Sequence, residues 1–235
     1  MNATCYLSVI PVRKEPSDAS EMVTQLLYGE SMTILHEKDN WTMIRCEHDG
    51  YEGWVSGKQL TAESNPPDVI GMARTTVIQM NDVLIPIGAF IRDSKYLLEA
   101  PVRTIEQYAR LFLGTPYLWG GRTAMGIDCS GFTQIILRLV GVNLPRDAWQ
   151  QALEGQEVSF IEECRTGDLA FFDNTEGRII HVGIVLRPDG TFPPTIIHAS
   201  GKVRIDALDH QGIFNKESGS YSHNLRMIRR YPIAQ

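Results

Sequence analysis

The sequence predicts a small all-β barrel followed by a larger α+β domain. Over residues 4–60, short runs of β-prone residues alternate with turn signals such as Asp39-Asn40 and His48-Asp49-Gly50, which is typical of a small barrel. From about residue 100, helical patterns come first and strand patterns follow. That order of elements indicates an α+β domain.

The composition is that of an ordinary globular protein and limits the classes of partner. The 235 residues are 43% hydrophobic and 21% charged, so we expect a sizeable core. A formal net charge of −6 without a basic run argues against nucleic-acid binding. The chain shows no signal-peptide pattern and no apolar run of membrane-spanning length. We therefore expect a cytoplasmic protein without a membrane partner, although a chain whose export signal had been removed would look the same.

The cysteines are spread along the chain without metal-ligand spacing, at Cys5, Cys46, Cys129 and Cys164. A chain of this size does not depend on disulfide bonds for its stability. A reducing compartment is therefore the simpler interpretation, and a Cys5–Cys46 bridge is compatible with the sequence without being implied by it.

The strand patterns of the first domain lie within residues 1–61, at Thr4–Ile10, Met22–Tyr28, Ser31–Glu37, Trp41–Cys46 and Tyr51–Val55. A linker with the core Ser64-Asn65-Pro66-Pro67 follows. Residues 62–99 comprise this linker together with either a β-rich extension of the next domain or a reduced second barrel.

Residues 100–235 form the predicted α+β domain. Apolar spacing predicts helices over Arg103–Leu113, from Cys129 to Val140, and over Arg146–Leu153. The strand patterns are Asp168–Phe172, Ile179–Leu186, Thr195–Ala199 and Leu225–Arg230.

Cys129 is the first candidate for a catalytic residue. It follows Asp128, a favoured helix N-cap, and so occupies the first helical position. The helix dipole and the unpaired backbone N–H groups there favour the thiolate, and the N–H of Cys129 itself is placed to face an oxyanion. A lone cysteine is more often a small buried apolar residue, but flanking glycines and downstream histidines favour a nucleophile.

A cysteine nucleophile needs a base and a third group that orients the base. His181 and His198 each interrupt an apolar strand pattern, where a polar side chain is costly unless it has a partner. Two neighbouring strands would place His198 beside His181 and aim His181 at Cys129. Each histidine alone is equally compatible with a satisfied core residue, and a zinc site is disfavoured because the positions are dispersed and lack a fourth ligand. The other histidines, His36, His48, His210 and His223, are expected to be solvated.

Five blocks of the C-terminal half resemble, in order, the NlpC-type cell-wall peptidases, which are papain-like cysteine peptidases. They are Pro116-Tyr117-Leu118-Trp119-Gly120-Gly121, Asp128-Cys129-Ser130-Gly131-Phe132, Gly167-Asp168-Leu169-Ala170-Phe171-Phe172, His181-Val182-Gly183-Ile184 and Ile197-His198-Ala199. The resemblance implies that Cys129 is the nucleophile, His181 the general base and His198 the orienting residue. The family cleaves the bond from the γ-carboxyl of D-glutamate to a diamino acid in murein peptides, and no cofactor or metal is implied.

The first domain resembles the bacterial SH3-like domain through Gly29-Glu30, Asn40-Trp41-Thr42-Met43-Ile44 and Gly53-Trp54-Val55. NlpC-type peptidases with such a domain cut only after a free N-terminal L-Ala-γ-D-Glu, and the SH3-like domain closes one end of their cleft.

The resemblance also implies substrate-binding residues. Asp147 matches the acidic position that contacts the amine, Tyr51 resembles the barrel tyrosine, and Glu21 and Glu30 are both candidates for the second acid. Asp128, Ser130 and Trp119 match residues lining the D-Glu and scissile-bond pockets. Asp147 as a helix cap, Tyr51 as a surface aromatic and Trp119 as a core residue remain alternatives.

We therefore expect a monomeric, cytoplasmic cysteine peptidase that recycles a murein tripeptide or a related cell-wall peptide and releases L-Ala-D-Glu. Three alternatives stay open at this point. They are a wall-lytic endopeptidase acting on intact peptidoglycan, an inert wall-binding protein of the same fold, and an amidase or acyltransferase.

Overall fold

The computed structural model describes residues 2–62, 66–75, 77–80, 83–94, 97, 100–187 and 190–233. The chain divides into two compact units. The N-terminal unit consists of Met1–Val102 and Leu118–Gly126, and the C-terminal unit of Arg103–Tyr117 and Ile127–Gln235. The segment Leu118–Gly126, which the sequence places inside the α+β domain, thus belongs to the N-terminal unit.

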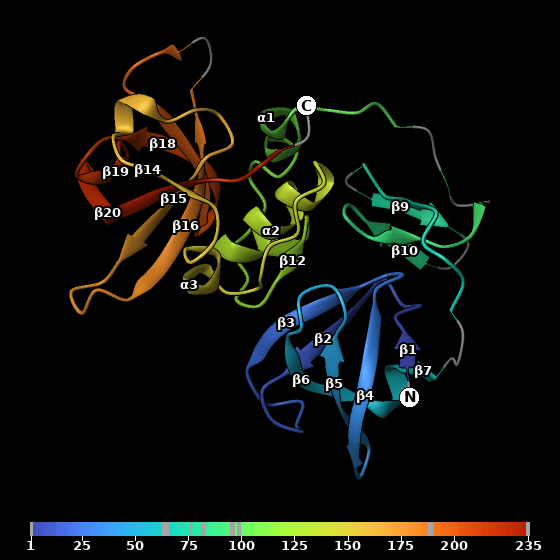
Figure 1. Cartoon of the computed structure of the whole chain (residues 1–235). Coiled ribbons are helices and arrows are strands. Elements are labelled where there is room, and N and C mark those ends of the chain that lie inside the picture. The colour runs from blue at the N-terminus through green and yellow to red at the C-terminus, as the bar shows by residue number, and fades with distance from the viewer. Residues whose placement is uncertain are drawn as a thin grey trace. The chain divides into compact units, whose positions relative to one another are not determined.

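The N-terminal unit is built on one antiparallel sheet with the strand order β3-β2-β6-β5-β4-β1-β7 (Figure 1). Alternation along β2 and β5 turns Ile10, Val12 and Ile44 into a core that also buries Cys5 and Cys46. The predicted all-β SH3-like fold is confirmed, but the predicted strand Thr4–Ile10 is wrong because a bend separates β1 from β2. The strands are β1 (Asn2–Thr4), β2 (Val9–Arg13), β3 (Met22–Leu27), β4 (Ser31–Lys38), β5 (Trp41–Cys46), β6 (Glu52–Ser56) and β7 (Thr61–Ala62).

Two short strand pairs follow the main sheet. β8 (Gly71–Met72) pairs with β11 (Phe90–Ile91), and β9 (Val77–Met80) pairs with β10 (Val83–Pro86). The β-rich character expected for residues 62–99 is therefore present, and it belongs to the N-terminal unit. Ser64 and Asn65 of the expected linker lie outside the described residues.

Arg122 anchors the Leu118–Gly126 segment within the N-terminal unit. Its side chain and that of Glu30 are both fully buried. The guanidinium donates to both carboxylate oxygens of Glu30 at 2.9 Å and to the carbonyl of Gln25 at 2.6 Å. Because desolvating two charges costs several kcal/mol, such a pair persists only with this dense set of partners.

Close backbone packing of the Leu118–Gly126 segment explains why the Trp119-Gly120-Gly121 motif contains two glycines. Gly120 has a φ of +77°, and a Cβ there would lie 2.4 Å from the carbonyl oxygen of Met22. A Cβ on Gly121 would lie 2.5 Å from the carbonyl oxygen of Gly126. The motif is therefore a place where backbone packs directly on backbone.

The C-terminal unit contains a sheet with the order β14-β20-β15-β16-β17-β18-β19, which an additional β19–β20 pairing closes. One face carries a core cluster that includes Phe172, Val185, Ile196 and Leu208. The strands are β14 (Gln156–Val158), β15 (Leu169–Asp173), β16 (Ile179–Leu186), β17 (Thr195–Ser200), β18 (Lys202–Leu208), β19 (Gly212–Asn215) and β20 (Ser220–Arg230).

The helices of the C-terminal unit are α1 (Ile105–Arg110), α2 (Cys129–Leu139) and α3 (Ala148–Gln151). α2 packs against β16 and β17 (Figure 1). The predicted α+β class is confirmed, and β16 has the predicted bounds. Strands β18 and β19 were not predicted, although polar and apolar residues alternate along β18. None of the helices in the described part of the chain has the length and apolar character needed to cross a bilayer.

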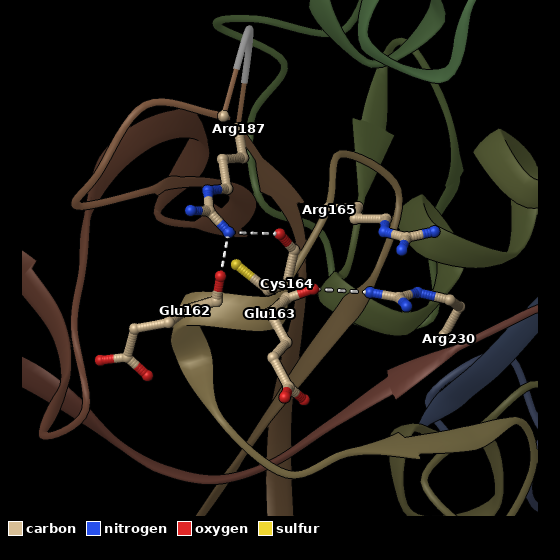
Figure 2. Close-up of a pocket in the computed structure, with 7 residues that line it drawn as sticks. Glu162, Glu163, Cys164, Arg165, Arg187 and Arg230 are labelled. Atoms are coloured by element: carbon tan, nitrogen blue, oxygen red, sulfur yellow. Dashed lines mark hydrogen bonds between the residues drawn. The ribbon is translucent and has the colours of Figure 1, made fainter.

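An arginine-lined cavity of about 590 Å³ lies beyond the C-terminal end of β16 (Figure 2). Arg187, which follows β16, binds the carbonyl oxygens of Glu162, Cys164 and Thr191. Arg230 donates to both carboxylate oxygens of Asp168 at 2.8 Å. These two arginines tie the 3-10 turn Ile161–Glu163 to the sheet, so we interpret them as structural.

We predict that the Arg122–Glu30 pair is essential to the N-terminal unit. Arg122→Met should lower the free energy of unfolding by about 3–5 kcal/mol, because it leaves a buried carboxylate without its main partner. The control is Arg45→Met, whose pair with Glu52 is 2.6 Å long but has side chains 55% and 40% exposed; it should lose less than about 1 kcal/mol. Urea unfolding measures both variants, and equal losses would contradict the prediction.

Candidate active site

The nucleophile position is set by the first turn of α2. Asp128 is the N-cap, and its carboxylate accepts a hydrogen bond from the backbone N–H of Gly131 at 2.7 Å. Cys129 is the first helical residue and is 7% exposed. The predicted cap and helix start are confirmed, so the sulfur is held at the positive end of a helix.

Arg146 fixes this turn from the other side and was missed by sequence reasoning. The buried guanidinium contacts both carboxylate oxygens of Asp128 and donates to the Ser130 hydroxyl at 2.8 Å. Gln151 of α3 is also buried and donates to the carbonyl of Ser130 at 3.1 Å. Asp128 and Ser130, which the resemblance assigns to the substrate pocket, therefore have structural partners that hold Cys129.

The two candidate histidines lie on neighbouring strands, as predicted. His181 is on β16 and His198 on β17, and the strand register pairs Gly183 with His198. Because side chains alternate along a strand, His181 and Gly183 share a face, and His181 Nε2 lies 2.8 Å from His198 Nδ1. A Cβ on Gly183 would lie 2.8 Å from the Cβ of His198, so glycine leaves the room for this contact.

The hydrogen-bonded chain from His181 through His198, here called the relay, continues to Asp206 on β18. His198 Nε2 lies 3.0 Å from the Asp206 carboxylate, and the side chains of both residues are almost completely buried. Arg204 binds the same carboxylate, with its Nε 2.7 Å from one oxygen and its Nη2 donating to the other at 3.0 Å. Polar and apolar residues alternate along Lys202–Leu208, but this strand was not predicted, and so neither residue was a candidate.

His223 of β20 completes the cluster and corrects the expectation that it is solvated. It is half-buried, and its ring stacks on that of His181 with centroids 4.1 Å apart and planes at 22°. His48 is also not solvated, since its side chain is 7% exposed and lies 3.0 Å from Asp49. His36 and His210 are exposed, as expected.

Burial keeps the thiol and the imidazole neutral at rest. Burial and the charge of Asp128 raise the pKa of Cys129 to about 12, although backbone hydrogen bonds from Val182 and Ser130 act in the opposite direction. Burial lowers the pKa of His181 well below its ordinary value, and the neighbouring His198 and His223 add to this. The expected shift toward thiolate is therefore wrong for the resting site, where the burial cost exceeds the helix-dipole effect.

The contact with Val182 places the thiol against β16, one residue from His181. Burial also raises the pKa of the Tyr117 phenol, and so do the nearby charges of Cys129 and Asp128. Thiol, imidazole relay and phenol thus gather in one unit. Chemically, a neutral thiol beside a neutral imidazole can pass its proton to that base when it attacks an electrophile.

The remaining predicted substrate residues divide between the two units. Asp147 lies in the C-terminal unit, half-buried at the N-cap of α3. The N-terminal unit holds Tyr51, Trp119 and Glu21; Tyr51 packs partly against the barrel core. Trp119 is 60% exposed, so the core alternative is wrong, and its indole donates to Glu21 at 2.8 Å. Glu30 is fully buried against Arg122.

Comparisons with known proteins agree with this geometry. The NlpC/P60 family model matches residues 114–220, and that of the bacterial dipeptidyl-peptidase SH3 domain matches residues 12–60. The γ-D-glutamyl-L-lysine dipeptidyl-peptidase of Bacillus subtilis is 31% identical over 202 residues, which are 68% of this chain and 68% of that protein.

A second relative of the same name, from Bacillus cereus, is 27% identical over 258 residues, covering 87% of this chain and 76% of the relative. The crystal structure of an NlpC/P60 family protein from Bacillus cereus covers 98% of this chain and 99% of its own, with a TM-score of 0.77 and 22% identity. This structural likeness supports the fold.

The buried histidines should make stability depend on pH. In the folded protein, burial lowers the pKa of His223 to about 4 and that of His181 well below its ordinary value. Between pH 6.5 and 4 the unfolded chain therefore binds more protons than the folded one, and the free energy of unfolding falls as pH is lowered. His223→Phe keeps the stacking but removes one titrating group, so the fall should be shallower.

Urea unfolding at several pH values across this window measures the slope. His210→Phe, at an exposed position, serves as the control and should keep the wild-type slope. A His223→Phe slope equal to that of the wild type would count against the prediction.

Proposed function

Because the chain belongs to the NlpC/P60 family of cysteine peptidases, we propose that it hydrolyses the bond between the γ-carboxyl of D-glutamate and a diamino acid in murein peptides. Its relatives from Bacillus cereus and Bacillus subtilis are γ-D-glutamyl-L-lysine dipeptidyl-peptidases by name. The observation that carries the proposal is the His181–His198 contact of 2.8 Å beside a thiol at the start of a helix. No cofactor is required by this chemistry.

In the proposed reaction, His181 removes the thiol proton of Cys129 as the sulfur attacks the γ-amide carbonyl. The backbone N–H of Cys129, at the helix start, stabilises the oxyanion of the tetrahedral intermediate. Collapse of this intermediate breaks the C–N bond, and the proton held by His181 passes to the leaving amine. Water activated by His181 then hydrolyses the thioester and releases the D-Glu carboxyl product.

We further propose that the enzyme acts on murein peptides with a free N-terminal L-Ala and releases L-Ala-D-Glu, as in cell-wall peptide recycling. Asp147 supports this part, because it is half-buried and lies next to Arg146, which holds the nucleophile turn. A carboxylate binds an ammonium through charge-assisted hydrogen bonds. An acylated amine carries no charge and cannot form such hydrogen bonds with Asp147, so blocked peptides would bind more weakly.

We also propose that Glu21, Tyr51 and Trp119 of the N-terminal unit contribute to substrate selection. Glu21 has a partly exposed carboxylate that already accepts the Trp119 indole N–H. Glu30 is excluded as the second acid that holds the substrate amine, because Arg122 binds both of its carboxylate oxygens. The monomeric, cytoplasmic setting expected from the sequence remains part of the proposal.

Cys129 should be the only thiol required for turnover. Cys129→Ala should abolish hydrolysis of L-Ala-γ-D-Glu-L-Lys, because it removes the sulfur that attacks the γ-amide carbonyl in the proposed reaction. Cys164→Ala is the matched control, since this cysteine is buried in the sheet core of the same unit. Mass spectrometry identifies the products, and L-Ala-D-Glu plus lysine is the expected pair. Release of any other pair by the wild type would exclude the proposed bond specificity.

A free N-terminal amine should be required for efficient cleavage of the tripeptide. The wild type should cleave the free tripeptide with a much higher kcat/KM than its N-acetylated form. Asp147→Asn should lower kcat/KM for the free peptide by about 1.5–3 kcal/mol of transition-state binding, which is the range for a hydrogen bond to a charged group. Asp173→Asn, in the same unit but part of a half-exposed ion pair with Arg226, is the control. Equal kcat/KM values for both peptides would instead favour an enzyme acting on intact peptidoglycan.

A further inference from the structure

The hydrogen-bond chain from β16 to β18 determines which nitrogen of His181 is free to act as a base. Three side chains form it in sequence: His181 Nε2 to His198 Nδ1 at 2.8 Å, and His198 Nε2 to the Asp206 carboxylate at 3.0 Å. A neutral imidazole has one N–H donor and one bare acceptor nitrogen. Once the protonation state of the residue at one end of this hydrogen-bonded series is known, the positions of the protons on both histidines follow from it.

The Asp206 end is fixed because its carboxylate is ionised. Burial alone would raise the pKa of Asp206, but hydrogen bonds from His198 and Arg204 outweigh it and lower the pKa. An ionised carboxylate only accepts hydrogen bonds, so the proton of His198 must sit on Nε2. His198 Nδ1 is then an acceptor, the proton of His181 must sit on Nε2, and Nδ1 of His181 is left bare.

Arg204 holds the carboxylate in this role. It lies directly opposite His198 in the β17–β18 register and contacts both oxygens of Asp206. Its own guanidinium is steadied by Glu217 at 3.0 Å and by the Asn215 side chain at 3.1 Å. The carboxylate is thus oriented as well as kept charged.

We propose that Asp206 is a positioning residue that sets the tautomer of both histidines and stabilises the imidazolium that forms when His181 accepts the thiol proton. The inference rests on the proposed function only in assigning His181 as the base for Cys129. Asp206 does not touch the reacting atoms, so it acts through His198. It extends the catalytic set by one buried carboxylate.

Several charged or titratable groups lie near the two histidines of this relay. His223 of β20 lies against His181, and Cys129 of α2 contacts the backbone of the neighbouring Val182, while Asp206 and Arg204 of β18 lie against His198. Asp206 is the anion in hydrogen-bond contact with an imidazole of the relay among the described residues. Removing its charge therefore lowers the affinity of the relay for a proton, whereas neutralising a more distant carboxylate does not.

The first test reads tautomers directly and needs no substrate. Long-range ¹H–¹⁵N NMR of the full-length wild type should show the Nε2–H tautomer at both His181 and His198, with assignments from His181→Gln and His198→Gln. In Asp206→Asn the side-chain amide is isosteric but can donate, so an Nδ1–H population should appear at His198. An Nδ1–H form of either histidine in the wild type would overturn the proposal.

The second test uses kinetics with L-Ala-γ-D-Glu-L-Lys. Asp206→Asn should lower kcat about 10- to 100-fold, the range for a residue that orients a catalytic histidine from behind, while KM stays unchanged. The acid limb of kcat/KM should also move to lower pH, because the relay then holds its proton less tightly. The control is Glu157→Gln, which removes a 68% exposed carboxylate of the same unit that pairs with Arg229, and it should leave kcat and the pH profile unchanged.

The outcomes separate this inference from the proposed function. If the wild type fails to cleave the tripeptide but shows both Nε2–H tautomers that Asp206→Asn disturbs, the substrate assignment fails and the relay stands. If Asp206→Asn keeps the wild-type tautomers and kcat, or lowers kcat without moving the acid limb, Asp206 is only a structural residue and the proposal is overturned. A thermal melt of each variant shows that it is folded.

Discussion

The buried Asp128–Arg146 ion pair is the interaction on which the position of Cys129, the proposed nucleophile, depends. Asp128 caps α2 through the Gly131 N–H, and Arg146 binds both that carboxylate and the Ser130 hydroxyl. Since each group would be costly to bury alone, the pair forms only when the start of α2 and the segment before α3 have reached their final places. The same rule fixes the relay through Asp206 and Arg204, and the Leu118–Gly126 segment through Glu30 and Arg122. Arginines paired with buried carboxylates therefore set the geometry of both units.

Burial also determines how the nucleophile is activated. A thiol whose pKa is raised to about 12 and an imidazole whose pKa is well below its ordinary value form a neutral pair. Under the proposed function, these shifts favour a pair without separated charges at rest and a proton transfer that accompanies attack on the substrate. The Asp206 carboxylate at the far end of the relay then stabilises the imidazolium, because the positive charge exists only after that proton transfer.

Sequence reasoning placed residues correctly where a local signal marks them. Asp128 is a recognisable cap, and His181 and His198 stand out because each is polar within an apolar strand. It failed where the partner comes from a segment that was not predicted or that lies far away in the sequence. Arg146 precedes a helix of one turn, Asp206 and His223 lie on strand segments that were not predicted, and Arg122 binds Glu30, which lies 92 residues from it in the same unit. These partners are brought together by tertiary contacts, which periodicity does not encode.

Strand register connects these observations. The relay runs diagonally across β16, β17 and β18, with Gly183 opposite His198 and Ile196 opposite Asp206. Because side chains alternate with a period of two, a slip of one residue on β17 would turn His198 away from both neighbours and place Ile197 between them. The apolar core pins this register, since Val185, Ile196 and Leu208 lie on the same face as the relay and must stay buried. The hydrophobic pattern of the sheet thereby holds polar groups to hydrogen-bond distance, and Gly183 keeps the space between them open.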